Sequence, residues 1–291
     1  MTCQEHRAVG WDGLWFDCPT TMEVVVAGPR HLLLESSLAP ILEIRWQQGS
    51  GRQSVDSIID TIIHRTSDRE AVLRPISLPE HIRQLALPHL RGLSWHDDLR
   101  LDGLVWQCPT CQTVIFCHLT NRQQTGYDTL LLLLQTVRCH LDTGQERLWS
   151  VQDFRLTLPA AFTFVDSSFA AGLSRLAFSG CGLKVQYCRL AFASARLAQM
   201  SLGQLLTEML GCNQTAETVR ETATLCEMRT QPSFWGRLHA LLARRPVFSW
   251  GRIWHDAAHN RLLAIVAHGK QPIAQATVQQ LAITYEILPR Q

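Results

Sequence analysis

The sequence carries one pattern of apolar and polar residues twice, once in each half. Residues 13–28 and 153–172 each contain an alternating run that reaches a proline, Pro19 or Pro159, and then a second run that ends in Ala-Gly. Further alternating runs follow at 31–35 and 41–46 in the first half, and at 173–178 and 183–188 in the second. Strict alternation is typical of half-buried β-strands joined by turns. The pattern therefore predicts the same series of antiparallel strands in both halves.

A helical pattern follows the strands in each half. Residues 54–63 and 201–210 both begin with serine and carry apolar residues at the second, fifth, sixth, ninth and tenth positions. This spacing places the apolar side chains in one stripe along a helix, and Ser54 and Ser201 suit the N-cap position. Trp106 and Trp254 then open two further similar runs, and an apolar segment closes each half.

These matches keep their order along the chain at offsets of 140 to 148 residues, which indicates a tandem duplication. We expect an α+β fold in which an antiparallel-sheet-plus-helix unit occurs twice, in residues 1–145 and 146–291, as halves related by a pseudo-twofold axis. The proline-rich connector at 74–92 is expected to be irregular or helical. Residues 233–246 are expected to form a helix that ends at Pro246.

The start of the strand series resembles a known family. Residues 154–162, FRLTLPAAF, and less closely residues 14–22, LWFDCPTTM, are similar to the opening of the Mog1/PsbP-like family. Met22 stands where that pattern has an aromatic residue. The resemblance covers only the opening part of each half. It implies an antiparallel sheet flanked by helices and a role in binding or assembly, and it carries over no catalytic residue.

The composition predicts a folded cytoplasmic protein. Apolar residues make up 46% of the chain and charged residues 18%, which is enough apolar material for a sizeable core. The net charge of +2 does not by itself favour nucleic acid. The start of the chain lacks the pattern of a secretory signal, and apolar runs such as Leu130 to Leu134 are far shorter than the ~20 residues of a membrane helix. Ten cysteines then indicate a reducing compartment.

The segment VWQCPTCQTVIFCH, residues 105–118, resembles half of a zinc site, because Cys108 and Cys111 flank a short turn. If Trp106 corresponds to Trp254, the two cysteines fall opposite Asp256 and His259, so the turn does not need thiols in order to form. Three interpretations stay open. The turn residues have no special role, or Cys108, Cys111, Asp256 and His259 converge on one zinc ion between the halves. In the third, the two cysteines belong to a local site with Cys117, His118, Cys139 or His140, or to a redox pair.

A second candidate site combines arginine with tryptophan, and its residues are Trp235, Arg237, Arg244, Arg245, Trp250, Arg252 and Trp254. Such a set suits a protein interface or the stacking and charge neutralisation of nucleic acid, but a core with a solvated face gives the same pattern. The chain lacks the common nucleophile, phosphate-loop and HExxH motifs. We therefore expect a non-catalytic adaptor or accessory subunit that binds a partner protein and no membrane. The alternatives are a nucleic-acid-associated factor and a metal-binding protein or enzyme with its site between the repeats.

Overall fold

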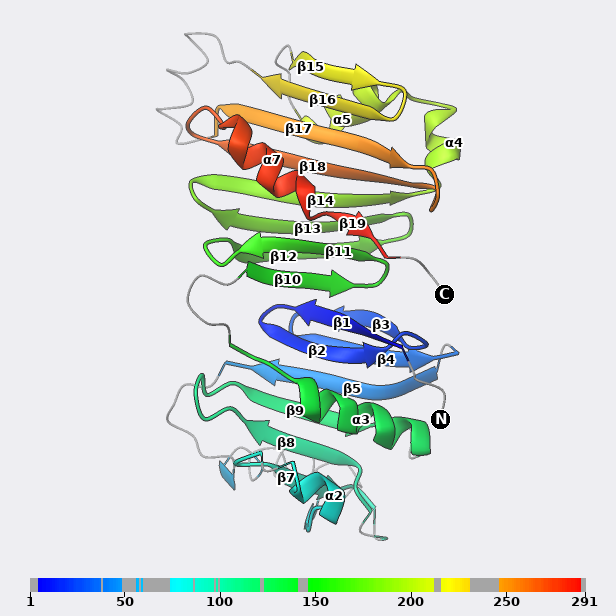
Figure 1. Cartoon of the computed structure of the whole chain (residues 1–291), viewed down its shortest axis with the longest axis vertical. Coiled ribbons are helices and arrows are strands. Elements are labelled where there is room, and N and C mark those ends of the chain that lie inside the picture. Colours follow the sequence, from blue (N-terminus) through cyan, green and yellow to red (C-terminus); the bar gives the residue numbers. More distant parts are fainter. Residues whose placement is uncertain are drawn as a thin grey trace, which may run out of the picture. The chain divides into compact units, whose positions relative to one another are not determined.

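The computed structural model describes residues 5–37, 39–48, 56–57, 59, 74–85, 87–96, 98, 100–120, 123–140, 146–211, 216–230 and 246–288. These residues form mostly antiparallel β-sheets with flanking helices (Figure 1). The chain divides into two compact units. The first contains Met1–Thr143 with Arg147–Gln152, and the second is essentially Asp153–Arg290.

The first unit is built on a seven-stranded antiparallel sheet with the order β3-β4-β5-β9-β8-β7-β6. Its strands are β3 (Glu23–Gly28), β4 (His31–Ser36), β5 (Ala39–Gln47), β6 (Arg74–Ile76), β7 (Arg91–Ser94), β8 (Gly103–Gln107) and β9 (Val114–Leu119). A hairpin of β1 (His6–Trp11) and β2 (Leu14–Pro19) pairs with β10 (Glu146–Val151). The helices are α2 (Glu80–Arg83) and α3 (Gln124–Thr136), and α3 packs against β2 and β5.

The second unit contains another seven-stranded antiparallel sheet, with the order β12-β13-β14-β18-β17-β16-β15. Its strands are β12 (Thr163–Ala170), β13 (Leu173–Gly180), β14 (Leu183–Ala191), β15 (Ala216–Thr222), β16 (Leu225–Thr230), β17 (Phe248–Asp256) and β18 (Arg261–Gly269). Strand β11 (Phe154–Pro159) pairs with β19 (Glu286–Ile287). The helices are α4 (Ala193–Leu197), α5 (Leu202–Leu210) and α7 (Gln275–Ile283). None of the helices in the described part of the chain has the length and apolar character needed to cross a membrane.

The two large sheets have the same strand order. In each, the first three strands run in chain order from one edge, and the last four return from the opposite edge to the middle. Helical residues separate the third strand from the fourth in both units, as α4 and α5 in the second and as Asp56, Ser57 and Ile59 in the first. The alternating strands expected from the sequence are therefore confirmed. Most of the expected helix at 54–63, including Ser54, and residues 233–245 of the one expected at 233–246 lie outside the described residues.

The connector at 74–92 differs from the expectation, because part of it joins the sheet. It contains β6, α2 and the start of β7, and the corresponding part of the second unit contributes β15 and β16. Strand β6 has only three residues, so it is too short to show alternation. The sequence of β15, AETVRET, is almost wholly polar, and that strand lies at the exposed edge of its sheet.

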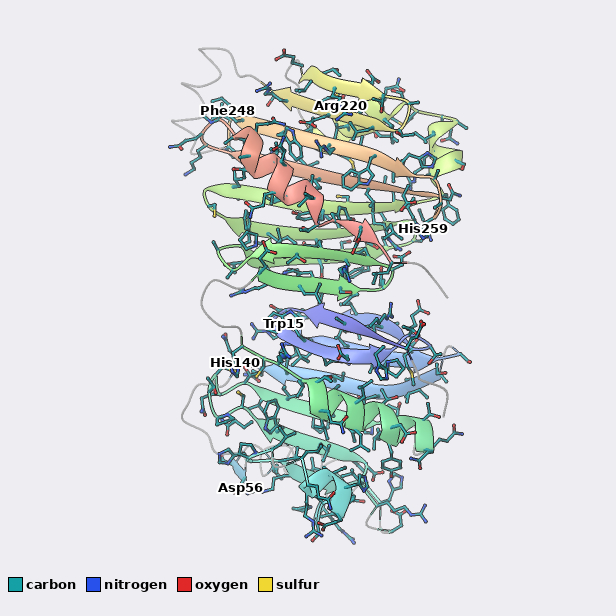
Figure 2. All side chains as sticks on the ribbon, in the orientation of Figure 1. Trp15, Asp56, His140, Arg220, Phe248 and His259 are labelled. Atoms are coloured by element: carbon teal, nitrogen blue, oxygen red, sulfur yellow. The ribbon has the colours of Figure 1, made fainter. Side chains whose placement is uncertain are left out.

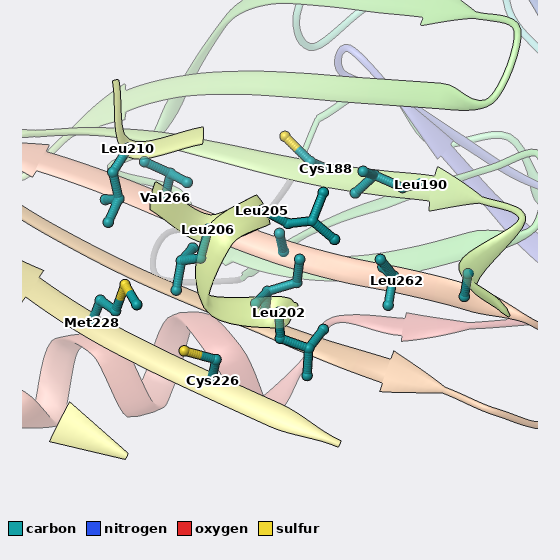
Figure 3. Packing of buried hydrophobic residues seen from close by; sticks show 13 residues of the cluster. Cys188, Leu190, Leu202, Leu205, Leu206, Leu210, Cys226, Met228, Leu262 and Val266 are labelled. Atoms are coloured by element: carbon teal, nitrogen blue, oxygen red, sulfur yellow. The ribbon is translucent and has the colours of Figure 1, made fainter. Parts of the chain in front are cut away.

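Helix α5 covers one face of the second sheet (Figure 3). Ser201 and Gln204 form a capping box at its start, as the serine predicted, and Gly211 ends it in the left-handed conformation. Gly251 of β17 allows close packing, because a Cβ atom there would lie 2.7 Å from Leu206 Cδ1. Leu206 is fully buried, and burying a leucine side chain contributes about 1.5–3 kcal/mol.

Helix α7 packs on the other face of this sheet. The hydroxyl of Tyr187 donates a hydrogen bond to the backbone oxygen of Leu281 in α7 (3.0 Å). Tyr285 follows the helix and meets the rings of Tyr187, Trp254 and Phe154 edge-on, with centroids 5.2, 5.6 and 6.3 Å away. The second sheet is thus covered on both faces.

The sheet edges carry irregularities that disfavour pairing with another chain. Edge strands β3, β12 and β15 each contain a shift in register, typical of a β-bulge. A bulge bends the strand and interrupts the row of free backbone groups that an incoming strand would need. Docking by strand addition is therefore not favoured at these three edges.

Candidate metal centre

The turn between β8 and β9 presents two cysteines to one side. The backbone nitrogen of Cys108 donates to the oxygen of Thr113 (2.9 Å), and the nitrogen of Gln112 donates to the oxygen of Cys108 (3.0 Å). Gln112 has a φ of 59°, which lets the chain reverse before β9 begins. The Gln112 side chain also bonds Gln107 Nε2 and the backbone of Pro109, so the turn is closed without a metal ion. Its conformation places the sulfur atoms of Cys108 and Cys111 close enough to bind one metal ion.

A second segment, directly after α3, brings another cysteine and a histidine to the same place. Helix α3 ends at Thr136, whose hydroxyl accepts a hydrogen bond from the backbone nitrogen of Asp17 (2.9 Å). Arg138 then pairs with Trp15 of β2 through two backbone hydrogen bonds of 2.8 and 2.7 Å. This bridge fixes the path of the two residues that follow, Cys139 and His140. Figure 2 labels Trp15 and His140, which mark this region of the first unit.

The four side chains form one compact cluster. The Sγ atoms of Cys108, Cys111 and Cys139 and a ring nitrogen of His140 all lie within 4.8 Å of one another. Cys111 Sγ is 3.3 Å from Cys139 Sγ, and His140 Nδ1 is 3.5 Å from Cys108 Sγ and 3.7 Å from Cys139 Sγ. In a tetrahedral zinc site with Zn–S of about 2.3 Å and Zn–N of about 2.0 Å, two sulfurs are about 3.8 Å apart and a sulfur and nitrogen about 3.6 Å apart. The three distances given above match these spacings to within about half an ångström, and the other pairs of ligand atoms lie within 4.8 Å.

The ligand atoms lie at the boundary between core and solvent. Cys108 and Cys139 are 1% and 9% exposed, Cys111 is half-buried and His140 is exposed. Burial raises the pKa of Cys139, and its hydrogen bonds to the thiols of Cys111 and Cys108 raise it further. Burial also acts to raise the pKa of Cys111, but hydrogen bonds to Thr113 outweigh it and hold the pKa below its usual value. A bound cation would favour the thiolate form of all three cysteines.

Of the four additional ligands that the sequence suggested for a local site, two join the cluster and two do not. Cys139 and His140 are in it. Cys117 is buried in β9, where burial raises its pKa to about 12, and it is outside the cluster. His118 hydrogen-bonds Glu43 through Nδ1 (3.3 Å), and its ring packs against Trp95 with centroids 4.9 Å apart.

Asp256 and His259, the other two residues of the predicted site between the halves, lie at the turn that joins β17 to β18. His259 Nδ1 is 2.9 Å from Asp256 Oδ2, and the backbone nitrogen of His259 donates to Asp256 Oδ1 (3.2 Å). These residues close their own turn, which contains no thiol. Their convergence with Cys108 and Cys111 on one ion stays a prediction.

Part of the arginine–tryptophan set is described by the structure. Trp250 is buried, and its indole nitrogen donates to Glu227 Oε1 (2.9 Å). Arg252 forms two hydrogen bonds to Glu227 Oε2 (2.7 and 3.1 Å), and Trp254 packs edge-on against Tyr285. These three residues therefore contribute to the packing of the second unit. The remaining four residues, Trp235, Arg237, Arg244 and Arg245, lie outside the described part of the chain.

The sequence did not identify Glu227 as the partner of Arg252. Glu227 stands in the strand LCEMRT between Cys226 and Met228, and a charged residue between two apolar ones was the available signal.

Comparison of the chain with models of known protein families gives no match, and no curated protein matches it either. The resemblance to the Mog1/PsbP-like family thus stays a prediction.

Proposed function

We propose that this chain is a zinc-binding, non-catalytic protein of the cytoplasm that acts by binding a partner protein. The observation that carries the proposal is the cluster of Cys108, Cys111, Cys139 and His140, whose four ligand atoms all lie within 4.8 Å of one another. Three thiolates and one imidazole are a common ligand set for structural zinc.

The number of ligands supports a structural rather than a catalytic ion. Catalytic zinc sites have three protein ligands and leave the fourth position to water or substrate. Here the protein offers four ligands, so a bound zinc ion has no vacant position for a reactant. Sulfur-rich tetrahedral sites also select zinc over magnesium or calcium, which prefer oxygen ligands.

Zinc at this position would join two parts of the first unit that are distant in sequence. Cys108 and Cys111 belong to the β8–β9 turn, and Cys139 and His140 follow α3. The second segment is itself bonded to β2 through Arg138 and Trp15. The ion would therefore connect the main sheet to the β1–β2 hairpin and hold the end of α3 in place.

We further propose that the two units arose by duplication of one α+β module, of the kind that the Mog1/PsbP-like resemblance implies. Three observations support this origin. The sheets have the same strand order, and the first strand of each, β3 or β12, is a bulged edge strand. Gln112 and Asn260 both adopt positive φ in the turn between the last two strands. The second unit is then a version of the module without the metal site.

The partner-binding role follows from the absence of a visible reaction centre in the sequence and from the closed ligand set of the metal site. A nucleic-acid-associated role is the alternative. It depends on Trp235, Arg237, Arg244 and Arg245, because Arg252 is already paired with Glu227. Salt-dependent retention on heparin that disappears in the Arg244→Ala/Arg245→Ala variant would favour the alternative, and unchanged retention would remove it.

The zinc proposal is tested by the metal content of the purified full-length chain. We expect about one zinc ion per chain, and less than about a tenth of that in Cys108→Ser, because a tetrahedral site with three remaining ligands binds far more weakly. Cys117→Ser is the matched control, since Cys117 lies in the same hairpin but outside the cluster, and it should keep the zinc. A wild-type chain expressed with zinc available that contains none, or a Cys108→Ser chain that keeps it, contradicts the proposal.

A further inference from the structure

We propose that the zinc centre is sensitive to oxidation, and that peroxide converts Cys111 and Cys139 into a disulfide with release of the zinc ion. This inference rests on the proposed zinc site and adds regulation to it. The two sulfur atoms are 3.3 Å apart, which is closer than the other spacings measured within the cluster. The bond would require an approach of a little over 1 Å to the usual S–S length of about 2.05 Å.

The exposure of the three thiols identifies the sulfur that reacts first. Cys108 is 1% exposed and Cys139 is 9% exposed, whereas Cys111 is only half-buried. A small oxidant from solvent therefore reaches Cys111 before the other two. Oxidation of cysteine requires thiolate character, which coordination to zinc provides, together with access to the oxidant.

The reaction balances with one molecule of hydrogen peroxide. The thiolate of Cys111 attacks one peroxide oxygen, so that an S–O bond forms, the O–O bond breaks and hydroxide leaves. The thiolate of Cys139 then attacks the sulfur of the resulting sulfenic acid, which forms the S–S bond and expels a second hydroxide. Two protons convert the hydroxides to water. The two cysteines have lost two electrons and peroxide has gained them.

Cys108 takes no part in this step. Its sulfur lies beside His140 Nδ1, at 3.5 Å, and is almost completely shielded from solvent. After the disulfide forms, Cys108 and His140 are the two ligands left, and a structural zinc site needs four. Loss of the ion follows directly.

The disulfide would preserve the connection that zinc had made. Cys111 lies in the β8–β9 turn and Cys139 lies in the segment after α3, so the covalent bond joins the same two elements. The oxidised chain would therefore melt at a higher temperature than the reduced, zinc-free chain. Oxidation would remove the metal while the turn remains fixed to the end of α3.

The test uses the zinc-loaded full-length chain in the Cys181→Ser background, because Cys181 is an exposed thiol outside the cluster. A few equivalents of hydrogen peroxide are added, zinc release is followed with a chromogenic chelator, and disulfides are mapped by non-reducing peptide mass spectrometry. We expect about one zinc ion released for each Cys111–Cys139 disulfide formed, and recovery of both thiols and bound zinc after reduction and addition of zinc.

Two further variants separate disulfide formation from metal binding. In the metal-free Cys108→Ser chain, peroxide should still form the Cys111–Cys139 disulfide, whereas in Cys139→Ser it should not. Zinc that stays bound while peroxide is consumed, or a Cys108–Cys111 disulfide as the main product, would overturn the inference. Neither result would contradict the proposal that the reduced chain binds zinc. A wild-type chain without zinc would instead refute the proposed function, because metal content is measured before any oxidant is added.

Discussion

In the second unit, the imidazole Nδ1 of His259 lies 2.9 Å from the Oδ2 atom of Asp256, so that one side-chain pair closes the β17–β18 turn. The β8–β9 turn holds the same place in the first sheet, between its last two strands, and carries Cys108 and Cys111. The two sheets thus carry turns of different chemistry at the same place in the strand order. This contrast provides an internal control for the proposed effect of zinc.

The first prediction compares the two turns. The side chains of His259 and Asp256 are 32% and 23% exposed, so the pair is partly screened by water, and we expect His259→Ala to lower the free energy of unfolding by less than about 1 kcal/mol. Cys108→Ser, which loses the zinc, should lower the free energy of unfolding by several kcal/mol relative to the zinc-loaded wild-type chain, because structural zinc binding in peptides is worth about 10–16 kcal/mol. Urea denaturation of both variants measures the difference. Equal losses would contradict a stabilising metal in the first unit.

Removal of zinc should affect one unit only. Chelation is expected to increase amide hydrogen exchange in β8, in β9 and in the segment at residues 137–140, because these elements lose the zinc ion that connects them. Exchange in β17 and β18 should not change, since the Asp256–His259 pair does not depend on a metal. Mass-spectrometric hydrogen exchange of the full chain with and without chelator gives both readings. Equal increases in the two units would show that the ion is not local to the first.

Glu227→Gln should destabilise the second unit. The carboxylate is 3% exposed and pairs with Arg252, which is 19% exposed. Removing the negative charge leaves a largely buried guanidinium uncompensated, at a cost of about 3 kcal/mol. Asp166→Asn is the matched control, because its pair with Arg175 is largely exposed and should cost less than about 0.5 kcal/mol. If Glu227→Gln leaves the free energy of unfolding unchanged, Arg252 does not need this partner in the folded state and is free to bind another anion.

The pH dependence of stability should include a contribution from Glu43. Burial tends to raise the pKa of this carboxyl, but hydrogen bonds from Arg45 and His118 and the nearby charge of His31 outweigh it, so the pKa lies below its usual value. A lowered pKa contributes stability above the unfolded-state pKa of about 4.3, and that contribution is lost as the pH falls through the folded-state value. Glu43→Gln should therefore flatten the loss of stability below about pH 4.5.

This measurement is best made in the Cys108→Ser background, where release of zinc in acid cannot add to the slope. Urea midpoints of the single and double variants at several pH values between neutrality and pH 3 provide the comparison. Parallel curves for the two chains would mean that the pKa of Glu43 is the same in the folded and unfolded states.

The sequence predicted most strands of the fold because their alternation is a local property. It also predicted α5, whose capping serine and apolar stripe both lie within ten residues. It did not predict β1, β6, β7, β10, β15 or β16. Strand β6 is too short to alternate and β15 is almost wholly polar, so their place in the sheets depends on neighbours that are distant in sequence.

The metal ligands show the same limit. The sequence singled out Cys108 and Cys111 and named Cys139 and His140 among several possible partners, but it could not choose between them. The choice depends on the bridge between Arg138 and Trp15, which carries the end of α3 to the β8–β9 turn. Trp15 and Arg138 are distant in sequence, and no local pattern connects them. Cys117 and His118 are closer in sequence to the turn, but they lie within β9 and outside the cluster.

X-ray absorption spectroscopy at the zinc edge tests the proposed centre most directly, because it counts the atoms bound to the ion. We expect three sulfur atoms at about 2.3 Å and one nitrogen at about 2.0 Å, with the histidine signal lost in His140→Ala. A shell of two sulfurs with one nitrogen and one oxygen would instead assign the ion to Cys108, Cys111, Asp256 and His259. That result would contradict the local site in the first unit.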